Sequence, residues 1–285
     1  MIPSNFDYVA PNTLDEAVSA LAAAGEDAKV LGGGQSLMPV LRLRMAAPTT
    51  IVDLGRVAEL RGVREDGDVI VIGAMTTHHD VAHDATVRRH AALLSEASAT
   101  VADPQIRHRG TFGGGIAHAD PAGDLCAPAL ALDATMVCVG PNGRREVAAA
   151  DFFTDYFTTA LEPDEILAEV RIPKHTGWVA HYEKFHRVEQ SWSMVAVAAT
   201  LEVEGGTIKR AGVALTNMAA VPVRAKGVEE ALVGQPATVE SIRAAADRAA
   251  EGTDPMADGN ADVEYRTHLA KVLTRRAVVE AAGVG

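Results

Sequence analysis

Two glycine-rich runs constrain this chain more than any other feature. Residues 32–36, Gly-Gly-Gly-Gln-Ser, directly follow a predicted strand at residues 29–31. The second run begins Thr-Phe-Gly-Gly-Gly at Thr111 and continues to a carboxylate at Asp124. Consecutive glycines leave a backbone whose N–H groups can approach a ligand, and pyrophosphate oxygens accept from such groups. Each run alone is more typical of a mobile loop or a tight hairpin than of a ligand site. Together they predict a site for a phosphorylated cofactor, with Asp124 accepting from one of its hydroxyls.

The short nucleotide-binding fingerprints do not fit either run. Leu37 and His118 occupy the positions where G-x-G-x-x-G requires its third glycine, and no G-x-x-x-x-G-K-[ST] is present. Asp53 does lie at about the distance expected of a ribose-binding acid. Pro39, however, falls inside the helix that should follow the first run, where proline removes a backbone hydrogen bond. A Rossmann fold is therefore disfavoured.

Composition excludes several classes of function. A formal net charge of -12 disfavours binding to nucleic acid. Two cysteines, Cys126 and Cys138, are too few to hold an iron–sulfur cluster, and so few suit a reducing cytosol. The N-terminus lacks the features of a signal peptide, and the longest apolar runs are shorter than the ~18 residues of a membrane-spanning helix. We expect a cytoplasmic protein without a transmembrane segment.

The order of predicted elements indicates an α+β fold in two domains. A capping box at Thr13 opens a helix that ends at Gly25, and residues 76–102 read as helical with a break near Asp84. Strands are predicted before Pro173 at residues 29–31, 50–54, 69–73, 134–139, 144–147 and 166–172. The Asn-Gly turn signal at residues 142–143 predicts that 134–139 and 144–147 form a hairpin. After it come strands at 179–186, 194–203 and 208–215, then helices at 225–232, 239–251 and 263–281. We place the domains at residues 1–175 and 176–285.

No side-chain constellation for catalysis is evident. His79 and His83 are four residues apart on a predicted helix, which is compatible with a metal site, but scattered histidines on a solvated face explain them better. No serine lies in a G-x-S-x-G motif. We predict no metal ligands and no catalytic side chains, and we assign the chemistry to a bound cofactor.

Sequence motifs over nearly the whole chain resemble one family. Both glycine runs are similar to the FAD-binding loops of the medium subunits of molybdenum hydroxylases, the xanthine dehydrogenase family. The resemblance is greatest to the medium subunits of aerobic carbon monoxide dehydrogenases. It continues through Ala102-Asp103-Pro104-Gln105-Ile106-Arg107, Tyr182-Glu183-Lys184, Leu215-Thr216-Asn217 and Glu264-Tyr265-Arg266-Thr267. It implies a two-lobed PCMH-type FAD-binding domain followed by a C-terminal domain of antiparallel sheet with helices.

The resemblance also implies the cofactor and its contacts. FAD would be bound non-covalently, with its pyrophosphate on the two glycine runs, a flavin hydroxyl on Asp124, and its ring near Leu167, Lys184 and Trp192. The implied binding residues are Gly32, Gly33, Gly34, Gln35, Ser36, Thr111, Phe112, Gly113, Gly114, Gly115, Asp124, Leu167, Lys184 and Trp192. On pattern alone, Lys184 fits a solvent-facing strand residue better. Trp192 fits a wedge between the domains equally well.

Two residues depart from the family pattern. Gly115 stands where the family usually has Asn, and Gln35 stands where it often has His. Both departures weaken side-chain contacts to the cofactor but preserve the backbone contacts.

The implied function is electron transfer within a complex. A large partner subunit would carry the molybdenum cofactor, and a small partner subunit would carry 2Fe-2S clusters, in a dimer of heterotrimers. This chain would take electrons from those clusters onto FAD and pass them to an external acceptor such as a quinone. Peripheral association with the inner face of the membrane is an open alternative to a purely cytoplasmic location. A stand-alone FAD oxidoreductase of the same fold and a non-catalytic nucleotide-binding or assembly protein are the other hypotheses.

Overall fold

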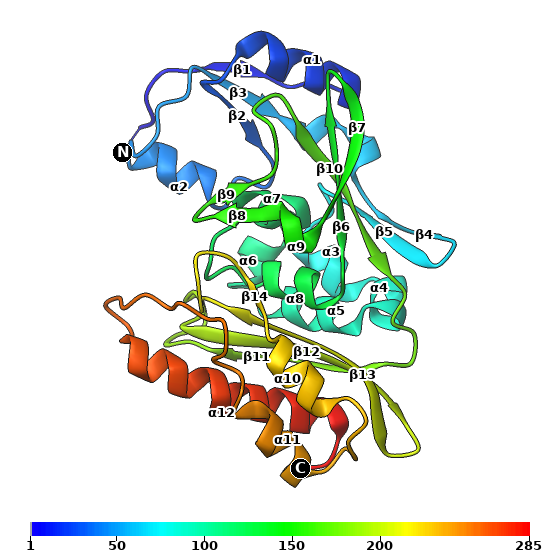
Figure 1. Ribbon diagram of the computed structural model, residues 1–285. Coiled ribbons are helices and arrows are strands. Elements are labelled where there is room, and N and C mark those ends of the chain that lie inside the picture. Colours follow the sequence, from blue (N-terminus) through cyan, green and yellow to red (C-terminus); the bar gives the residue numbers. More distant parts are fainter. Residues whose placement is uncertain (1) are drawn as a thin grey trace.

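The computed structural model describes residues 2–285, which form three stacked sheets with helices around and between them (Figure 1). The first sheet is parallel, with strand order β1 (Asp7–Val9), β3 (Thr50–Asp53) and β2 (Ala28–Leu31). Helix α1 (Leu14–Ala24) packs on it through an apolar face, which buries Leu14, Ala17, Val18 and Leu21. Two 3-10 turns, Leu54–Arg56 and Ala58–Leu60, lead from this sheet to the next.

The predicted start of helix α1 is confirmed, with one difference in its cap. The hydroxyl of Thr13 accepts from the amide of Glu16 at 3.2 Å, as a capping residue should. The carboxylate of Glu16 accepts from the amide of Asn12 at 2.8 Å instead of from Thr13. The helix ends at Gly25, as expected.

The expectation that Pro39 would remove a needed hydrogen bond from the helix after the first glycine run is wrong. Helix α2 (Leu37–Arg42) forms there, with Pro39 as its third residue. The first four amides of a helix have no acceptor within the helix, so proline at this place removes no helical hydrogen bond. The sheet of three parallel strands still lacks the doubly wound order of a Rossmann fold.

The second sheet has five antiparallel strands and forms the centre of the molecule. Its order is β4 (Val63–Asp66), β5 (Val69–Gly73), β10 (Ile166–Pro173), β6 (Thr135–Gly140) and β7 (Gly143–Ala148). The predicted β6–β7 hairpin is confirmed, with Gly140 paired to Gly143. A small two-stranded ribbon, β8 (Phe153–Asp155) and β9 (Thr158–Thr159), follows the short helix α9 (Ala149–Phe152).

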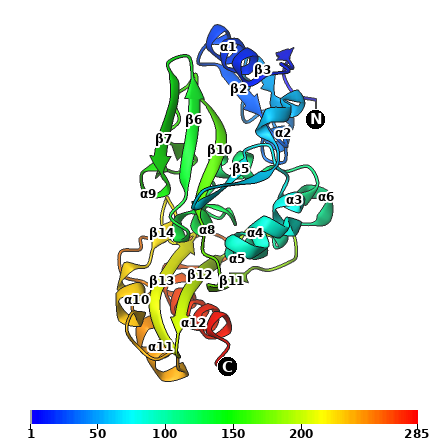
Figure 2. The same cartoon turned by 90° about the vertical axis from the view of Figure 1, so that its right-hand side faces the viewer.

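A layer of helices lies between the central sheet and the third sheet (Figures 1 and 2). The predicted helical stretch at 76–102 is confirmed as α3 (His78–His83), α4 (Ala85–His90) and α5 (Ala92–Ala99), with a second break at Ala91. Helices α6 (Pro104–Arg107), α7 (Phe112–His118) and α8 (Cys126–Ala131) follow. Helices α5 and α8 contact the third sheet from this side.

The third sheet confirms the predicted strands followed by helices. Its antiparallel order is β11 (Val179–Phe185), β12 (Val195–Glu204), β13 (Thr207–Thr216) and β14 (Val223–Arg224). Helices α10 (Lys226–Leu232), α11 (Val239–Ala246) and α12 (Val263–Ala282) cover its outer face. Both faces of β12 are therefore buried, which explains why its sequence is a continuous apolar run.

The α+β class is thus confirmed. The predicted division after residue 175 falls between β10 and β11, and it stays a prediction because one hydrophobic cluster includes Ile72 of β5, Leu130 of α8 and Ala198 of β12. Between residues 2 and 285, no helix combines the length and the apolar character needed to cross a bilayer.

Candidate functional site

The first glycine run presents a row of unpaired backbone donors. It connects the end of β2 to the start of α2. Within residues 2–285, the amides of Gly33, Gly34, Gln35 and Ser36 donate to no backbone or side-chain acceptor. Gly34 has φ +78°, a conformation that favours glycine and turns the chain sharply at this point. Adjacent free amides in such a turn form a concave binding site for an anion.

The second glycine run is different, because its amides have acceptors within the chain, and a contact between these residues and a cofactor stays a prediction. Residues 112–115 form the first turn of helix α7, with Thr111 as its cap. The amide of Phe112 donates to Thr76 O at 2.8 Å, and that of Gly113 to Ala74 O at 2.8 Å. The amides of Gly114 and Gly115 donate to Oγ1 and O of Thr111, at 3.2 and 3.0 Å. All four donors are used within the chain.

The two runs lie against each other. A Cβ placed on Gly33 would be 2.1 Å from Arg109 O, and one on Gly32 would be 3.0 Å from Thr111 Oγ1. Only glycine allows the backbones to approach so closely. The second run and the segment before it therefore form the wall against which the first run is held.

Asp124 is the centre of a buried polar cluster. Its Oδ1 accepts from the hydroxyls of Tyr182 and Ser193, each at 2.9 Å, and its Oδ2 accepts from Lys184 Nζ at 2.7 Å. Lys184 also donates to Thr100 O at 3.2 Å. The side chains of Asp124 and Lys184 are each 4% exposed, so the solvent-facing interpretation of Lys184 is wrong. Burial, with the negative charge of Asp124 beside it, raises the pKa of Tyr182 well above its usual range, which keeps the phenol a donor.

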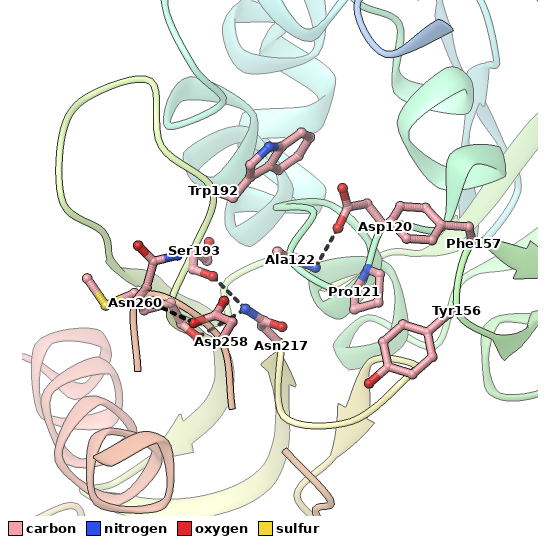
Figure 3. Close-up of a pocket in the computed structure, with 11 residues that line it drawn as sticks. Asp120, Pro121, Ala122, Tyr156, Phe157, Trp192, Ser193, Asn217, Asp258 and Asn260 are labelled. Carbon is pink, nitrogen blue, oxygen red and sulfur yellow. Dashed lines mark hydrogen bonds between the residues drawn. The ribbon is translucent and has the colours of Figure 1, made fainter. Parts of the chain in front are cut away.

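A cavity of about 270 Å³ opens beside this cluster (Figure 3). Trp192 lies on one side of it, and Tyr156 and Phe157 lie on the other. Trp192 is 57% exposed, which rules out a wedge between two domains, whereas the adjacent Ser193 is 2% exposed. Burial raises the pKa of Asp120, which also lines the cavity. The remaining lining residues are Pro121, Ala122, Ser193, Met194, Asn217, Asp258 and Asn260.

Two other predicted site residues lie in the core. Phe112 is fully buried and Leu167 is 4% exposed, both in the central hydrophobic cluster. A contact between either side chain and a cofactor ring stays a prediction. His79 stacks between His83 and His108, with ring centroids 4.3 and 3.9 Å apart.

Sequence reasoning missed two members of the Asp124 cluster. In the sequence, Ser193 lies in no catalytic motif, and Tyr182 is part only of the Tyr182-Glu183-Lys184 motif shared with the family. Tyr182 and Lys184 are two residues apart on a strand, so they share one face of β11. That alternation was the available signal for Tyr182. Nothing in the local sequence points to Ser193.

The site fits a cofactor with both phosphates and sugar hydroxyls. The free amides of the first run match anionic oxygens. A carboxylate offers about four lone-pair sites, and Asp124 uses three of them, so one further hydroxyl can donate to it.

Comparison with known families decides which cofactor this is. The family described as FAD binding domain in molybdopterin dehydrogenase matches residues 4–175. The family described as CO dehydrogenase flavoprotein C-terminal domain matches residues 180–281. The chain belongs to the FAD-binding flavoproteins of the molybdopterin dehydrogenases. Its cofactor is therefore FAD.

Individual relatives agree over the full length. The carbon monoxide dehydrogenase medium chain of Hydrogenophaga pseudoflava is 42% identical, across 98% of this chain and 97% of that protein. The solved structure of carbon monoxide dehydrogenase from Hydrogenophaga pseudoflava lacking the Mo-pyranopterin moiety matches with a TM-score of 0.95 and 43% identity, covering 99% of both chains. Quinoline 2-oxidoreductase from Pseudomonas putida 86 matches with a TM-score of 0.94 and 34% identity, again covering 99% of both.

Proposed function

We propose that this chain is the FAD-carrying medium subunit of a molybdenum hydroxylase of the carbon monoxide dehydrogenase type. The observation that carries the proposal is 42% identity to a carbon monoxide dehydrogenase medium chain over nearly all of both proteins. A chain of quinoline 2-oxidoreductase has the same fold at lower identity, so this fold by itself does not specify the primary substrate, which we assign to the large subunit.

FAD supplies the redox chemistry, and the residues of this chain bind and orient it. The amides of Gly33, Gly34, Gln35 and Ser36 would hold the pyrophosphate, and Asp124 would accept from a flavin hydroxyl. Because the contacts of the first run are backbone contacts, Gln35 in place of the family His would cost little. That run contains no histidine or cysteine, the side chains that typically attach a flavin covalently, so we expect all of the flavin to be released by acid denaturation.

Lys184 and Trp192 would act on the ring rather than on the phosphates. The ammonium group of Lys184 is buried beside Asp124, where its positive charge would favour added negative charge on a neighbouring ring. The exposed indole of Trp192 would cover one ring face. We also propose that residues 1–175 form the FAD-binding domain and that residues 176–285 complete the site with these two side chains.

The partners follow from the same assignment. A small subunit with 2Fe-2S clusters would deliver electrons, a large subunit would carry the molybdenum cofactor, and the complex would be a dimer of heterotrimers. The acceptor would be external, such as a quinone, met in the cytoplasm at the inner face of the membrane. Cys126 and Cys138 are both free and buried, which agrees with a reducing compartment and with clusters held elsewhere.

Co-expression with the neighbouring genes tests this function. We expect three subunits to co-purify with one FAD per medium chain, and carbon monoxide to bleach the flavin absorption anaerobically. Bleaching by an aldehyde or an N-heterocycle instead would retain the subunit assignment and change the substrate. A chain that purifies alone, binds FAD and oxidises a substrate without partners would contradict the proposal in favour of a stand-alone oxidoreductase. A chain without flavin would favour the assembly protein.

A further inference from the structure

The segment that carries Trp192 is fixed by bonds to its backbone. It lies between β11 and β12, where the amide of Met194 donates to Phe185 O at 2.8 Å. Trp192 is 57% exposed while its neighbour Ser193 is 2% exposed. The indole therefore projects from a short piece of buried backbone. Hydrogen-bond donors to the carbonyl groups of that backbone therefore also fix the direction of the indole.

Two residues from distant parts of the chain bind those carbonyls. Asn217 Nδ2 donates to Ser193 O at 2.8 Å and to Met194 O at 3.2 Å (Figure 3). Arg266 Nη1 donates to Met194 O from helix α12. Buried carbonyl groups require such partners, and losing one costs the full desolvation of the group.

Arg266 is an unusual residue for this task because it is 1% exposed. Its charge is balanced by Asp258, with Nη2 and Oδ2 2.7 Å apart. Taking a guanidinium group out of water is expensive, and apolar side chains would fill the same volume at less cost. The guanidinium instead links the backbone next to Trp192 with an acid that lines the same cavity.

Asn217 links the same segment to the Asp124 cluster. Its φ of +61° is a conformation that Asn tolerates better than most residues. Its backbone N–H donates to Pro121 O at 2.8 Å. Ser193 completes the connection, because its hydroxyl donates to Asp124. Residues 193–194, directly after Trp192, are therefore held from the 120–124 loop, from the end of β13 and from α12.

We propose that Arg266 and Asn217 are positioning residues that hold the indole of Trp192 over the flavin ring. The inference rests on the proposed function, which puts the ring beside Trp192. Neither residue belongs to the predicted phosphate or hydroxyl contacts. Removing either should therefore leave FAD bound while the indole loses its fixed position.

Indole fluorescence in the full-length chain tests this. The chain has two tryptophans, so Trp178→Phe gives a parent whose emission comes from Trp192 alone. We expect FAD to lower the emission of this parent at least threefold. Arg266→Met and Asn217→Gly should each lose more than half of that quenching and alter the flavin absorption band, while FAD affinity changes less than threefold. Arg266→Lys, which keeps a donor, should recover part of the quenching.

Arg276→Met is the matched control, since Arg276 lies on the same helix with its side chain 57% exposed and should quench like the parent. Quenching of parental size in both Arg266→Met and Asn217→Gly would overturn the proposal. If Arg266→Met does not fold, Asn217→Gly decides by the same criterion. If the parent binds FAD without quenching, Trp192 does not lie over the flavin ring, and the proposal is overturned. A parent that binds no FAD would contradict the proposed function itself.

Discussion

The two glycine runs look alike in sequence and differ in what their backbones do. In residues 33–36 the amides have no acceptor within residues 2–285, and in residues 112–115 every amide is bonded inside the chain. The first run is a turn between a strand and a helix, while the second is the start of a helix capped by Thr111. Glycine thus serves two purposes here. In the first run it exposes donors and, at Gly33, also allows close packing against Arg109, whereas in the second it serves close packing alone.

The difference teaches that a glycine triplet indicates close approach but not what is approached. At Gly113 the neighbour is Ala74 of the same chain, whose Cβ would be 2.3 Å from an added Cβ. The free amides of the first run, in contrast, have no hydrogen-bond acceptor within the described residues. Substitutions at Gly34 and Gln35 of the first run should therefore act on FAD binding, and those in the second run on stability, whereas Gly33 packs against Arg109 and a substitution there would affect both.

The largest effect is expected for Gly113→Ala. The added methyl would meet Ala74 Cβ at 2.3 Å and Cα at 2.6 Å, so the helix or the strand end must move. We expect a loss of about 3 kcal/mol in the free energy of unfolding, measured by urea denaturation. FAD affinity of the folded fraction should change less than threefold. Gly115→Ala, two residues along the same helix with its nearest neighbours at 3.6 Å, should be neutral or slightly stabilising.

A histidine buried against the second run should make the free energy of unfolding depend on pH. His78 lies against Gly110 and Gly115, and burial, with Arg107 adding to it, lowers its pKa to about 4. An unfolded histidine titrates near 6.5, so between these values the unfolded chain binds more protons and stability falls as pH falls. The loss from pH 6.5 to 4 should be about 3 kcal/mol for this group.

Urea denaturation across that pH range measures this loss. His78→Gln should remove that part of the pH dependence, whereas replacing the exposed His83 in the same way should not. An unchanged pH profile in His78→Gln would show that His78 is not neutral and buried.

The contrast between the two glycine runs shows which features the sequence could predict and which it could not. The strands and helices after Pro173 and the hairpin at residues 140–143 were predictable, because apolar periodicity and Asn-Gly turns are local signals. The role of the second run was not, because it depends on Ala74 and Thr76, which lie far away in the chain. The burial of Lys184 and the exposure of Trp192 likewise follow from packing between sheets.

A smaller effect, on FAD rather than on folding, is expected for Gly34→Ala. The left-handed conformation at φ +78° costs a non-glycine residue about 1–2 kcal/mol, and relaxing it would turn the free amides away. We expect FAD affinity to fall about tenfold in a fluorescence titration. Gly25→Ala is the control. Gly25 has φ +76° and lies at the end of α1, and a Cβ added there would have no neighbouring atom within 4 Å. It should lower stability through backbone strain of its own while FAD affinity stays normal.

The smallest effect is expected for Gln35→Ala. The side chain makes one long bond within its own loop, from Nε2 to Gly33 O at 3.4 Å. If the backbone holds the pyrophosphate, FAD affinity should change less than twofold in the same titration. A tenfold loss would show that the Gln35 side chain replaces the family histidine as a direct contact.

Amide hydrogen exchange with and without FAD, measured by mass spectrometry, is the most direct test of the contrast between the free amides of the first run and the bonded amides of the second. Without FAD, the amides of residues 33–36 should exchange rapidly because they have no acceptor, and those of residues 112–115 should exchange slowly. Added FAD should slow the first group strongly and leave the second almost unchanged. Rapid exchange at residues 112–115 that FAD then suppresses, with no change at residues 33–36, would contradict the account.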